Sequence, residues 1–589
     1  MSLFPPIHLS RLPMPRSSTP NASAPRPDVD ALRAAFSWAN VRAELAGLPG
    51  GRGLNVAHEA VDRHAASDRG GHAALRWGDA DNEGLTFTYR DLKKHTNRFA
   101  TVLRDLGLNE GETVVSLLGP VPHFGIAALG TLKSGAVFGP LSPTLDAESL
   151  AHRLDRSGVA MVVTTASLYD TTVAPLRERV QSLPDVLLVD AQEDRDNNVW
   201  SLPRRMRAAS AAVRIPATAP DDLALLHGSS RSVPAPLVLH GHEAALLHYA
   251  TARYALDLGP DDTVWCSAAP GWMVGTAYGL LAPLLHGATA VLTETDGTPA
   301  QVYRWLEAQA VTVWVTTPAG LRALVEAGPA AREDRDLSAL RHVVSVGAPL
   351  SPARAAAAQA LLGVPVYTAW AQTEAGGLLV ANSPALGHRP GTLGRPLPGI
   401  EAAVVRRTDD GLTMLPNEPG ELALRTSEDG PALFRGYLHE KGRYEDTVVD
   451  GWCLTGDIVR RDADGDLWFL GRANDVISLA GRMVSPIEIE RALDAHDAVA
   501  EAGVVGPAGP GDAPSVTAFV VLAPGHAPTD DLRRTLRDTV RRSLNGATET
   551  VTLRVVDALP TTERGTVLRG QLRAQAHPER DASPLETAP

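Results

Sequence analysis

The sequence predicts an α/β protein with a large N-terminal domain and a small α+β C-terminal domain. The chain has 589 residues, 44% of them hydrophobic, and single cores stop growing at about 250–300 residues, so we expect at least two domains. Up to about Pro390, short apolar runs alternate with helical patterns, and the pattern then changes to short strands interrupted by Gly, Pro and Asp. We therefore expect two doubly wound α/β subdomains and a small β-rich subdomain within the large domain.

Charge and cysteine content narrow the class of protein. The formal net charge of -13 argues against a nucleic-acid or anionic-membrane partner and favours a small-molecule substrate. The only cysteines, Cys266 and Cys453, are too few for a disulfide framework, which is typical of a reducing cytosol. No apolar run reaches the roughly 18 residues of a membrane span. We expect a soluble cytoplasmic protein without a membrane or nucleic-acid partner.

The ends of the chain are expected to be loose. Residues 1–30 are rich in Pro, Ser and Arg and predict a disordered tail; a transit peptide is less favoured because the prolines prevent an amphipathic helix. Residues 576–589 are polar and predict a second loose tail. Between the tails we expect the large domain over 31–473 and the small domain over 474–575.

The first α/β subdomain is predicted from a strand, a helix and a second strand near residue 113. These elements are expected at Thr113–Leu118, His123–Lys133 and Ala136–Leu141, with further strands at Met161–Thr165, Val186–Asp190 and Leu223–Leu226. The second subdomain is predicted to follow the first, with strands at Thr263–Ser267, Thr289–Thr293, Val311–Thr316 and Val343–Val346. Strands Gly399–Val405 and Glu421–Arg425 predict the β-rich subdomain.

The small domain is predicted from a mixture of strands and helices. The strands are expected at Gly503–Val505, Val516–Leu522 and Val551–Val556, and the helices at Pro486–Leu493 and Thr529–Leu544. A compact α+β module is the arrangement that this mixture favours.

Several runs resemble the motifs of a known enzyme family, in the family's order. The most diagnostic is GWCLTGD at Gly451–Asp457, followed by Gly471-Arg472, Gly481 and Glu488-Ile-Glu490. Supporting runs occur at Ala369–Glu374, Ser345–Leu350, Pro270–Trp272 and Phe434–Tyr437. From about Phe36 to Arg573 the chain resembles the AMP-forming acyl-CoA synthetase and adenylation-domain superfamily, most closely the acetyl-CoA synthetase branch. The resemblance implies adenylation of a carboxylate by ATP, transfer of the acyl group to CoA, and a C-terminal domain that rotates between the two steps.

Some residues on which this chemistry depends are kept. By the resemblance, Asp457 and Arg472 bind the nucleotide ribose, and a carboxylate suits two hydroxyl donors. Gln372, Thr373 and Glu374 match the segment that contacts the α-phosphate, with Glu374 as the magnesium ligand. Gly481 matches the position where CoA approaches the backbone. For Asp457 and Arg472 the alternative is a surface turn in which the two merely pair, and for Gly481 it is a simple turn.

Other family residues are replaced. Val233, Pro236 and Leu237 stand in the glycine and lysine positions of the family's phosphate-binding loop, and prolines remove N–H donors from such a nest. Thr566 stands where the family has the catalytic lysine of its C-terminal motif. The only lysines of the chain are Lys93, Lys94, Lys133 and Lys441, all before the small domain. We therefore expect ATP-dependent adenylation to be lost or strongly reduced.

The acyl pocket implied by the resemblance is also altered. Ala371 stands where the acetate-specific branch has a narrowing tryptophan, so we expect an acyl group larger than acetyl. The residues expected to line this pocket, with core packing as an equal alternative, are Trp272, Met273, Val274, Val346 and Ala371. His227 replaces a family aromatic and is a candidate for acid–base chemistry, although a core histidine is the more common case.

Three hypotheses follow from this mixture of kept and replaced family residues. In the first, a repurposed enzyme binds a carboxylic acid, acyl-CoA or acyl thioester in the old cleft, with His227, Arg231 and Arg564 as catalytic candidates. In the second, an ATP-dependent acyl-CoA ligase uses Arg231, Arg564 or Arg569 in place of lysine. In the third, a non-catalytic homologue binds an active synthetase or an acyl carrier protein. CoA or acyl-CoA is the expected cofactor, while the use of ATP, AMP and magnesium separates the first two readings.

Overall fold

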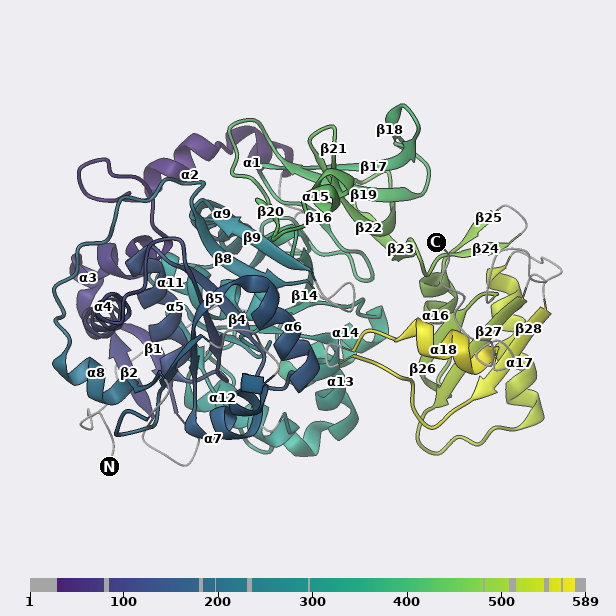
Figure 1. Ribbon diagram of the computed structural model, residues 1–589. Helices are drawn as coiled ribbons and strands as arrows, with labels where there is room; N and C mark the ends of the chain where they lie inside the picture. Colours follow the sequence, from purple (N-terminus) through teal and green to yellow (C-terminus); the bar gives the residue numbers. More distant parts are fainter. Residues whose placement is uncertain are drawn as a thin grey trace.

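The computed structural model describes residues 29–78, 84–178, 184–195, 198–229, 236–294, 297–479, 482–507, 515–544, 550–562 and 565–577. They form a large α/β domain and a smaller C-terminal domain, as the sequence predicts (Figure 1). The predicted tails lie mostly outside the described residues. Helix α1 (Val29–Ala35) includes the last two residues of the predicted first tail, and α18 (Arg569–Ala576) includes the first residue of the second.

A mostly parallel sheet of eight strands forms the first α/β layer. Its parallel pairs require crossovers, and α5 (Pro122–Ser134) is one of them. Pro122 suits the first turn of α5, and Gly135 ends the helix with a left-handed φ of 83°. In spatial order the strands are β20 (Gly436–Tyr437), β9 (Leu237–Gly241), β8 (Leu223–Gly228), β4 (Val137–Leu141), β3 (Thr113–Leu117), β5 (Val159–Thr164), β6 (Asp185–Leu188) and β7 (Val199–Ser201).

The second layer is a sheet of nine strands, and it corrects one expectation. The two sheets do not simply follow one another along the chain, because the first two strands of the protein belong to the second sheet. β1 pairs in parallel with β11, with Leu75 opposite Ala290, a long-range pairing that no local pattern reveals. In spatial order the strands are β16 (Arg395–Pro396), β15 (Gly377–Ala381), β14 (Val366–Gln372), β13 (His342–Val346), β12 (Val313–Thr316), β10 (Thr263–Cys266), β11 (Thr289–Leu292), β1 (Ala73–Trp77) and β2 (Leu85–Thr88).

Helices cover these two sheets. Helix α4 (Tyr89–Asp105) begins with a capping box in which Thr88 and Asp91 bond each other's backbone N–H groups. The other α-helices of the large domain are α2 (Trp38–Glu44), α3 (Arg63–Ala65), α6 (Ala147–Ser157), α7 (Ala166–Leu168), α8 (Leu202–Ala208), α9 (Ala244–Ala255), α10 (Met273–Thr276), α11 (Ala282–Leu285), α12 (Pro299–Ala308), α13 (Pro318–Ala327), α14 (Pro352–Leu362) and α15 (Lys441–Thr447). Within the described part of the chain, no helix combines the length and apolar character that a membrane crossing needs.

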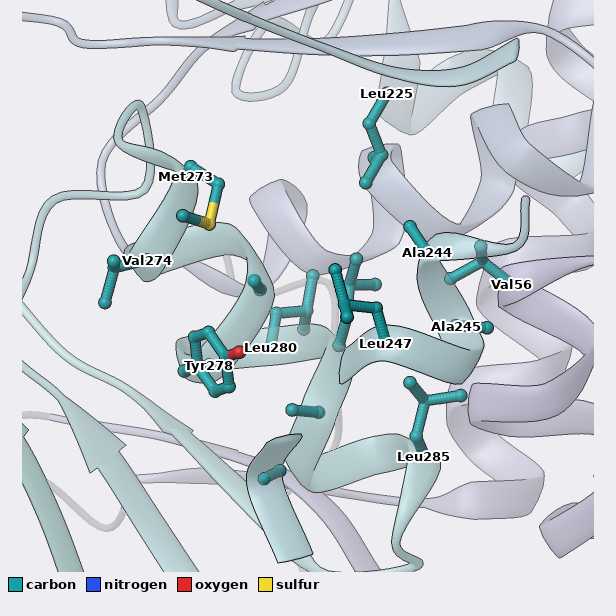
Figure 2. Packing of buried hydrophobic residues seen from close by; sticks show 14 of the residues in the cluster. Val56, Leu225, Ala244, Ala245, Leu247, Met273, Val274, Tyr278, Leu280 and Leu285 are labelled. Atoms are coloured by element: carbon teal, nitrogen blue, oxygen red, sulfur yellow. The ribbon is translucent and has the colours of Figure 1, made fainter. Parts of the chain in front are cut away.

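The main core lies among helices between the sheets. Figure 2 shows Leu247 of α9 packed near Tyr278 and Leu285, and all three are buried. Tyr278 accepts a 2.7 Å hydrogen bond from the backbone N–H of Leu378, so its hydroxyl is satisfied within the core.

The predicted β-rich subdomain is a six-stranded antiparallel sheet. It contains the strands predicted near residues 399 and 421. The strands are β18 (Gly411–Met414), β17 (Ile400–Thr408), β19 (Gly420–Thr426), β22 (Trp452–Arg461) and β21 (Val448–Val449), with β23 (Leu467–Arg472) paired to β22.

The small domain has its own core, as the predicted α+β module requires. Leu493, Val504, Val516 and Leu536 lie in a cluster separate from the large domain. Its elements are β24 (Ile477–Leu479), β25 (Arg482–Val484), α16 (Pro486–Asp494), β26 (Val499–Val505), β27 (Ser515–Leu522), α17 (Asp530–Ser543), β28 (Thr550–Val555) and α18.

Candidate functional site

A cavity of about 170 Å³ lies between the two domains. The large domain contributes Gly347–Ser351, which follows β13, and Ala369–Ala371 of β14. Asp457 and Arg472 of the β-rich sheet lie on the same wall. The small domain contributes residues of α16, of β26 and of the segment that leads into α18. Most of the charged residues that line the cavity therefore come from the small domain.

Asp457 and Arg472, the predicted ribose-binding pair, are brought together by strand pairing. They face each other on β22 and β23, with Arg472 Nε 3.7 Å from Asp457 Oδ1. The indole Nε1–H of Trp370 donates a 2.7 Å hydrogen bond to Asp457 Oδ2, and Asp457 is only 7% exposed. One carboxylate oxygen is thus held by Trp370, while the other lies on the side of Arg472.

The predicted phosphate and magnesium residues lie away from the cavity wall. Gln372 donates a long 3.4 Å hydrogen bond to the Thr455 carbonyl, while Thr373 and Glu374 are buried in the turn after β14. Glu374 Oε1 accepts hydrogen bonds from Ser229 Oγ at 2.9 Å and Tyr437 Oη at 3.2 Å. Glu374 Oε2 has no partner among the described residues. Glu374 could therefore offer a magnesium ion one free oxygen.

Several predicted residues lie outside the described part of the chain. They are Arg231 and Val233 of the altered loop, Arg564 and Gly481. The ends of the altered loop are described: the backbone N–H of Ser229 donates a 2.8 Å hydrogen bond to the Pro236 carbonyl, and Leu237 begins β9. Proline at 236 supplies no N–H to the loop.

Thr566 lies on the cavity wall, in a tight hairpin that projects from the small domain towards α13 and α14 (Figure 1). Thr561 and Val567 form an isolated antiparallel bridge, and the Gly565 N–H donates a 2.8 Å hydrogen bond to the Thr562 carbonyl. Gly565 has a φ of 83°, and a Cβ atom there would lie 3.2 Å from Ala319 of α13. A glycine at 565 therefore lets the hairpin contact the large domain and places Thr566 at the cavity.

Arg569, one candidate for replacing the missing lysine, is already committed to an ion pair. Its Nη2 lies 2.7 Å from each carboxylate oxygen of Glu490, and both residues are buried. Burial raises the pKa of Glu490, although Arg569 opposes that shift. A guanidinium that compensates a buried carboxylate is not free to stabilise a second anion.

Only one residue of the predicted acyl pocket reaches the cavity. Ala371 lines it, whereas Met273, Val274 and Val346 belong to the buried core, where Figure 2 shows the first two. Trp272 does not line the cavity but lies next to Gly347, which does, because a Cβ atom at Gly347 would come within 2.8 Å of Trp272 Cη2.

His227 is a core residue of β8. It is 1% exposed, and neither ring nitrogen has a hydrogen-bond partner among the described residues. Burial lowers the pKa of His227 well below its usual value, and the neighbouring His240 and His248 act in the same direction. Its ring packs edge-on against His240, with centroids 5.8 Å apart. The structure therefore places a neutral imidazole in the core and does not bring it to the cavity wall.

Most charged residues of the small-domain wall are not predicted from the sequence. Glu490, Arg491 and Asp494 lie on α16, and Glu501 lies on β26. In the sequence, the run Glu488–Glu490 indicates the family and not a cavity. Arg491, the charged residue that follows on the same predicted helix, is the signal that the sequence offers, but such a charge usually lies on a solvated helix face.

One cluster of possible metal ligands occurs within the described ranges. Asp462, Asp464 and Asp466 bring their carboxylates together in the turn between β22 and β23. Arg389 Nη1 lies 2.7 Å from Asp462 and 3.0 Å from Asp464. The Arg389 guanidinium therefore already balances the charge of these carboxylates without a metal ion.

Comparison with known proteins identifies relatives of both domains. The model of the AMP-binding enzyme family matches residues 61–438, and that of the AMP-binding enzyme C-terminal domain matches residues 488–566. The acetyl-coenzyme A synthetase of Bacillus subtilis is 34% identical over 542 residues, covering 92% of this chain and 93% of the relative.

Solved structures agree with this family match. The acyl-CoA synthetase of Brucella canis is 31% identical, with a TM-score of 0.72 over 94% of this chain and 99% of that protein. A benzoate CoA ligase from Burkholderia xenovorans is 25% identical, with a TM-score of 0.76 over 88% of this chain and 100% of that protein.

Proposed function

Because this chain belongs to the AMP-binding enzyme family, we propose that it is an acyl-CoA-synthetase-like protein whose ATP-dependent adenylation is lost or strongly reduced. Its substrate is a carboxylic acid, an acyl-CoA or another acyl thioester with an acyl group larger than acetyl. CoA or acyl-CoA is the ligand that we assign to the cavity between the domains.

The position of Thr566 on the cavity wall carries this proposal. Attack of a carboxylate on the α-phosphate builds negative charge, and a positioned cation at this point is worth about 10²–10³ in rate. Threonine supplies no charge there, and Arg569 beyond it is neutralised by Glu490. The loss of one such group does not add simply to the loss of others, so we expect very weak adenylation without assigning a summed energy.

Asp457 on the cavity wall supports binding of a ribose, whereas the predicted phosphate and magnesium residues lie away from that wall and give little support to a triphosphate with magnesium. Asp457 offers one oxygen beside Arg472, which suits a sugar hydroxyl. Glu374 has one oxygen held by Ser229 and Tyr437, and Pro236 removes a backbone donor from the phosphate loop. When bound, ATP would supply the leaving pyrophosphate; in the described part of the altered loop, Pro236 has no N–H to hold it.

Ala371 supports the larger acyl group. It lines the cavity and contributes a single methyl group, so it leaves space that a large side chain would fill. The relatives include an acetyl-coenzyme A synthetase, an acyl-CoA synthetase and a benzoate CoA ligase, so the family accommodates acids of different size.

A second function is favoured by Arg491, a cationic side chain on the cavity wall. In this alternative the protein is an ATP-dependent acyl-CoA ligase that uses arginine in place of lysine. In a third alternative, the protein is a non-catalytic homologue that binds an active synthetase or an acyl carrier protein.

The decisive measurement is pyrophosphate release with ATP, magnesium and acids from acetate to benzoate and octanoate. We expect wild-type release equal to that of the heat-denatured protein, together with calorimetric binding of CoA or an acyl-CoA. Thr566→Lys should raise release at least about tenfold, since it restores one of the missing groups. Gln571→Lys, an exposed position on α18, is the matched control and should change nothing.

Clear wild-type release would reject the proposal in favour of the arginine-dependent ligase. Absence of both release and CoA binding, with co-purification of a synthetase or carrier protein, would favour the non-catalytic homologue.

A further inference from the structure

Arg491 is a cavity residue that forms no ion pair with the described part of the chain. It lies in α16, and its guanidinium carbon lies 5.8 Å from the centre of the Trp468 ring. Within the described ranges it makes no side-chain hydrogen bond and no ion pair. Burial lowers the pKa of Arg491, since Glu488 and Glu490 only partly compensate the lost hydration.

The other arginines of the cavity are compensated. Arg569 pairs with Glu490, and Arg472 lies near Asp457. Arg354 donates a 3.1 Å hydrogen bond to the Ala500 carbonyl and lies 3.7 Å from Glu501. Among the described arginines of the cavity, Arg491 is therefore the one whose guanidinium N–H groups are available to a ligand.

The carboxylates near Arg491 do not replace such a ligand. Glu490, the preceding residue, is held by Arg569. Asp494 lies one turn further along α16 and forms no ion pair with Arg491 in the described structure. Burial raises the pKa of Asp494 to about 7, so much of this carboxyl is uncharged near neutral pH. A half-buried cation that faces a cavity in this way favours an anion.

We propose that Arg491 binds the phosphate ester of an adenine nucleotide or of CoA in the cavity between the domains. Arginine suits this role because its planar guanidinium offers paired donors to phosphate oxygens. The cavity places Arg491 on the small-domain wall and Asp457, which suits a ribose hydroxyl, on the large-domain wall. The inference rests on the proposed function, because it needs a cavity that binds such a ligand.

Calorimetric titration of the full-length protein tests this role, with AMP, CoA, dephospho-CoA and adenosine as probes. Arg491→Ala should weaken binding of the phosphate-bearing probe by about 10- to 100-fold, while adenosine affinity stays unchanged. Arg491→Lys should recover part of the loss. The matched control is Arg460→Ala, because Arg460 also lies over Trp468, at 5.9 Å, but does not line the cavity. This control should stay within about twofold of wild type.

The probes separate the sources of the phosphate. If Arg491→Ala loses affinity for CoA but not for dephospho-CoA, Arg491 contacts the 3′-phosphate. If it loses affinity for both, Arg491 contacts the pyrophosphate. If it loses affinity for AMP, Arg491 contacts the 5′-phosphate. Equal binding of these probes by wild type and Arg491→Ala would overturn the inference alone. A wild-type protein that binds none of them would overturn the proposed function as well. If Arg491→Ala does not fold, Arg491→Gln and the salt dependence of wild-type affinity give the same decision, and affinity that is independent of salt counts against an ionic contact.

Discussion

At the scale of single residues, Asp494 is the acid of the cavity that should titrate near neutral pH. Burial raises its pKa from the usual 3.8 to about 7; Glu490 and Glu501 add to the rise, while Arg354 and the backbone N–H of Ala502 oppose it. Asp494 Oδ1 has no hydrogen-bond partner among the described residues. The folded state therefore favours the protonated carboxyl.

This shift predicts how stability depends on pH. Between about pH 4 and pH 7 the folded protein binds the Asp494 proton and the unfolded chain does not, so this group makes stability fall as pH rises. Above about pH 7 Asp494 is ionised in the folded protein too, so the full cost of burying this charge lowers the free energy of unfolding. Asp494→Asn should therefore raise the melting temperature at pH 8, and the difference from wild type should shrink towards pH 5. A constant difference across this range would show that the substitution acts through packing.

The residue-scale predictions from sequence had different outcomes for one physical reason. Asp457 and Arg472 lie on strands joined by a short turn, so their proximity follows from local pairing. His227 and Glu374 depend on what covers them. His227 is enclosed by the core, and Glu374 is held by Ser229 and Tyr437, which are distant in sequence. A local sequence motif does not predict which distant segments will bury a residue.

At the scale of elements, helix α16 carries three charged residues of the cavity and depends on its N-cap. Ser485 Oγ accepts a 3.1 Å hydrogen bond from the Glu488 N–H and donates a 2.6 Å hydrogen bond to the Leu470 carbonyl. The cap thus joins α16 to the end of β23 in the large domain. Its loss should disturb both the helix and the cavity wall.

Ser485→Ala should lower stability by about 1–2 kcal/mol and weaken binding of the CoA or AMP probe. Thr529→Ala is the matched control, because Thr529 caps α17 through the Leu532 N–H at 3.3 Å and α17 does not line the cavity. Denaturant unfolding and calorimetry should show a stability loss in both variants, with reduced affinity only in Ser485→Ala. Equal affinities in the two variants would mean that α16 does not position the ligand.

The strands and helices that the sequence predicts lie within a few residues of observed elements, because hydrophobic periodicity is a local property. The predicted strand Val343–Val346 is β13 at His342–Val346, and the predicted helix Pro486–Leu493 is α16 at Pro486–Asp494. The pairing of β1 with β11 was not predicted. Strand order depends on contacts between distant segments, which periodicity does not encode.

At the scale of the whole molecule, Glu501 links the two domains. It forms ion pairs with Arg322 of α13 and Arg354 of α14, both in the large domain, and its side chain is 17% exposed. The Gly565 hairpin adds a second contact, against Ala319 of α13. These contacts join the two domains beside the cavity.

Glu501→Ala should favour a more open arrangement of the domains. Partly exposed pairs are each worth about 1 kcal/mol or less, so we expect a modest rise in the radius of gyration and faster proteolysis near residue 474. X-ray scattering and limited trypsin digestion measure these changes. Glu326→Ala is the control, since Glu326 pairs with Arg322 within α13. An unchanged scattering curve for Glu501→Ala would show that other contacts dominate the domain interface.

The sequence by itself determined the fold class, the family and the absence of lysine from the small domain, because these depend on residue identity and local periodicity. The tertiary structure alone decided which charges face the cavity: Thr566 and Arg491 line it, Arg569 is neutralised by Glu490, and His227 is buried. The reason is physical. The strength of a charge and the pKa of an acid or base depend on solvation and on partners, and both are set by segments that meet only when the chain folds.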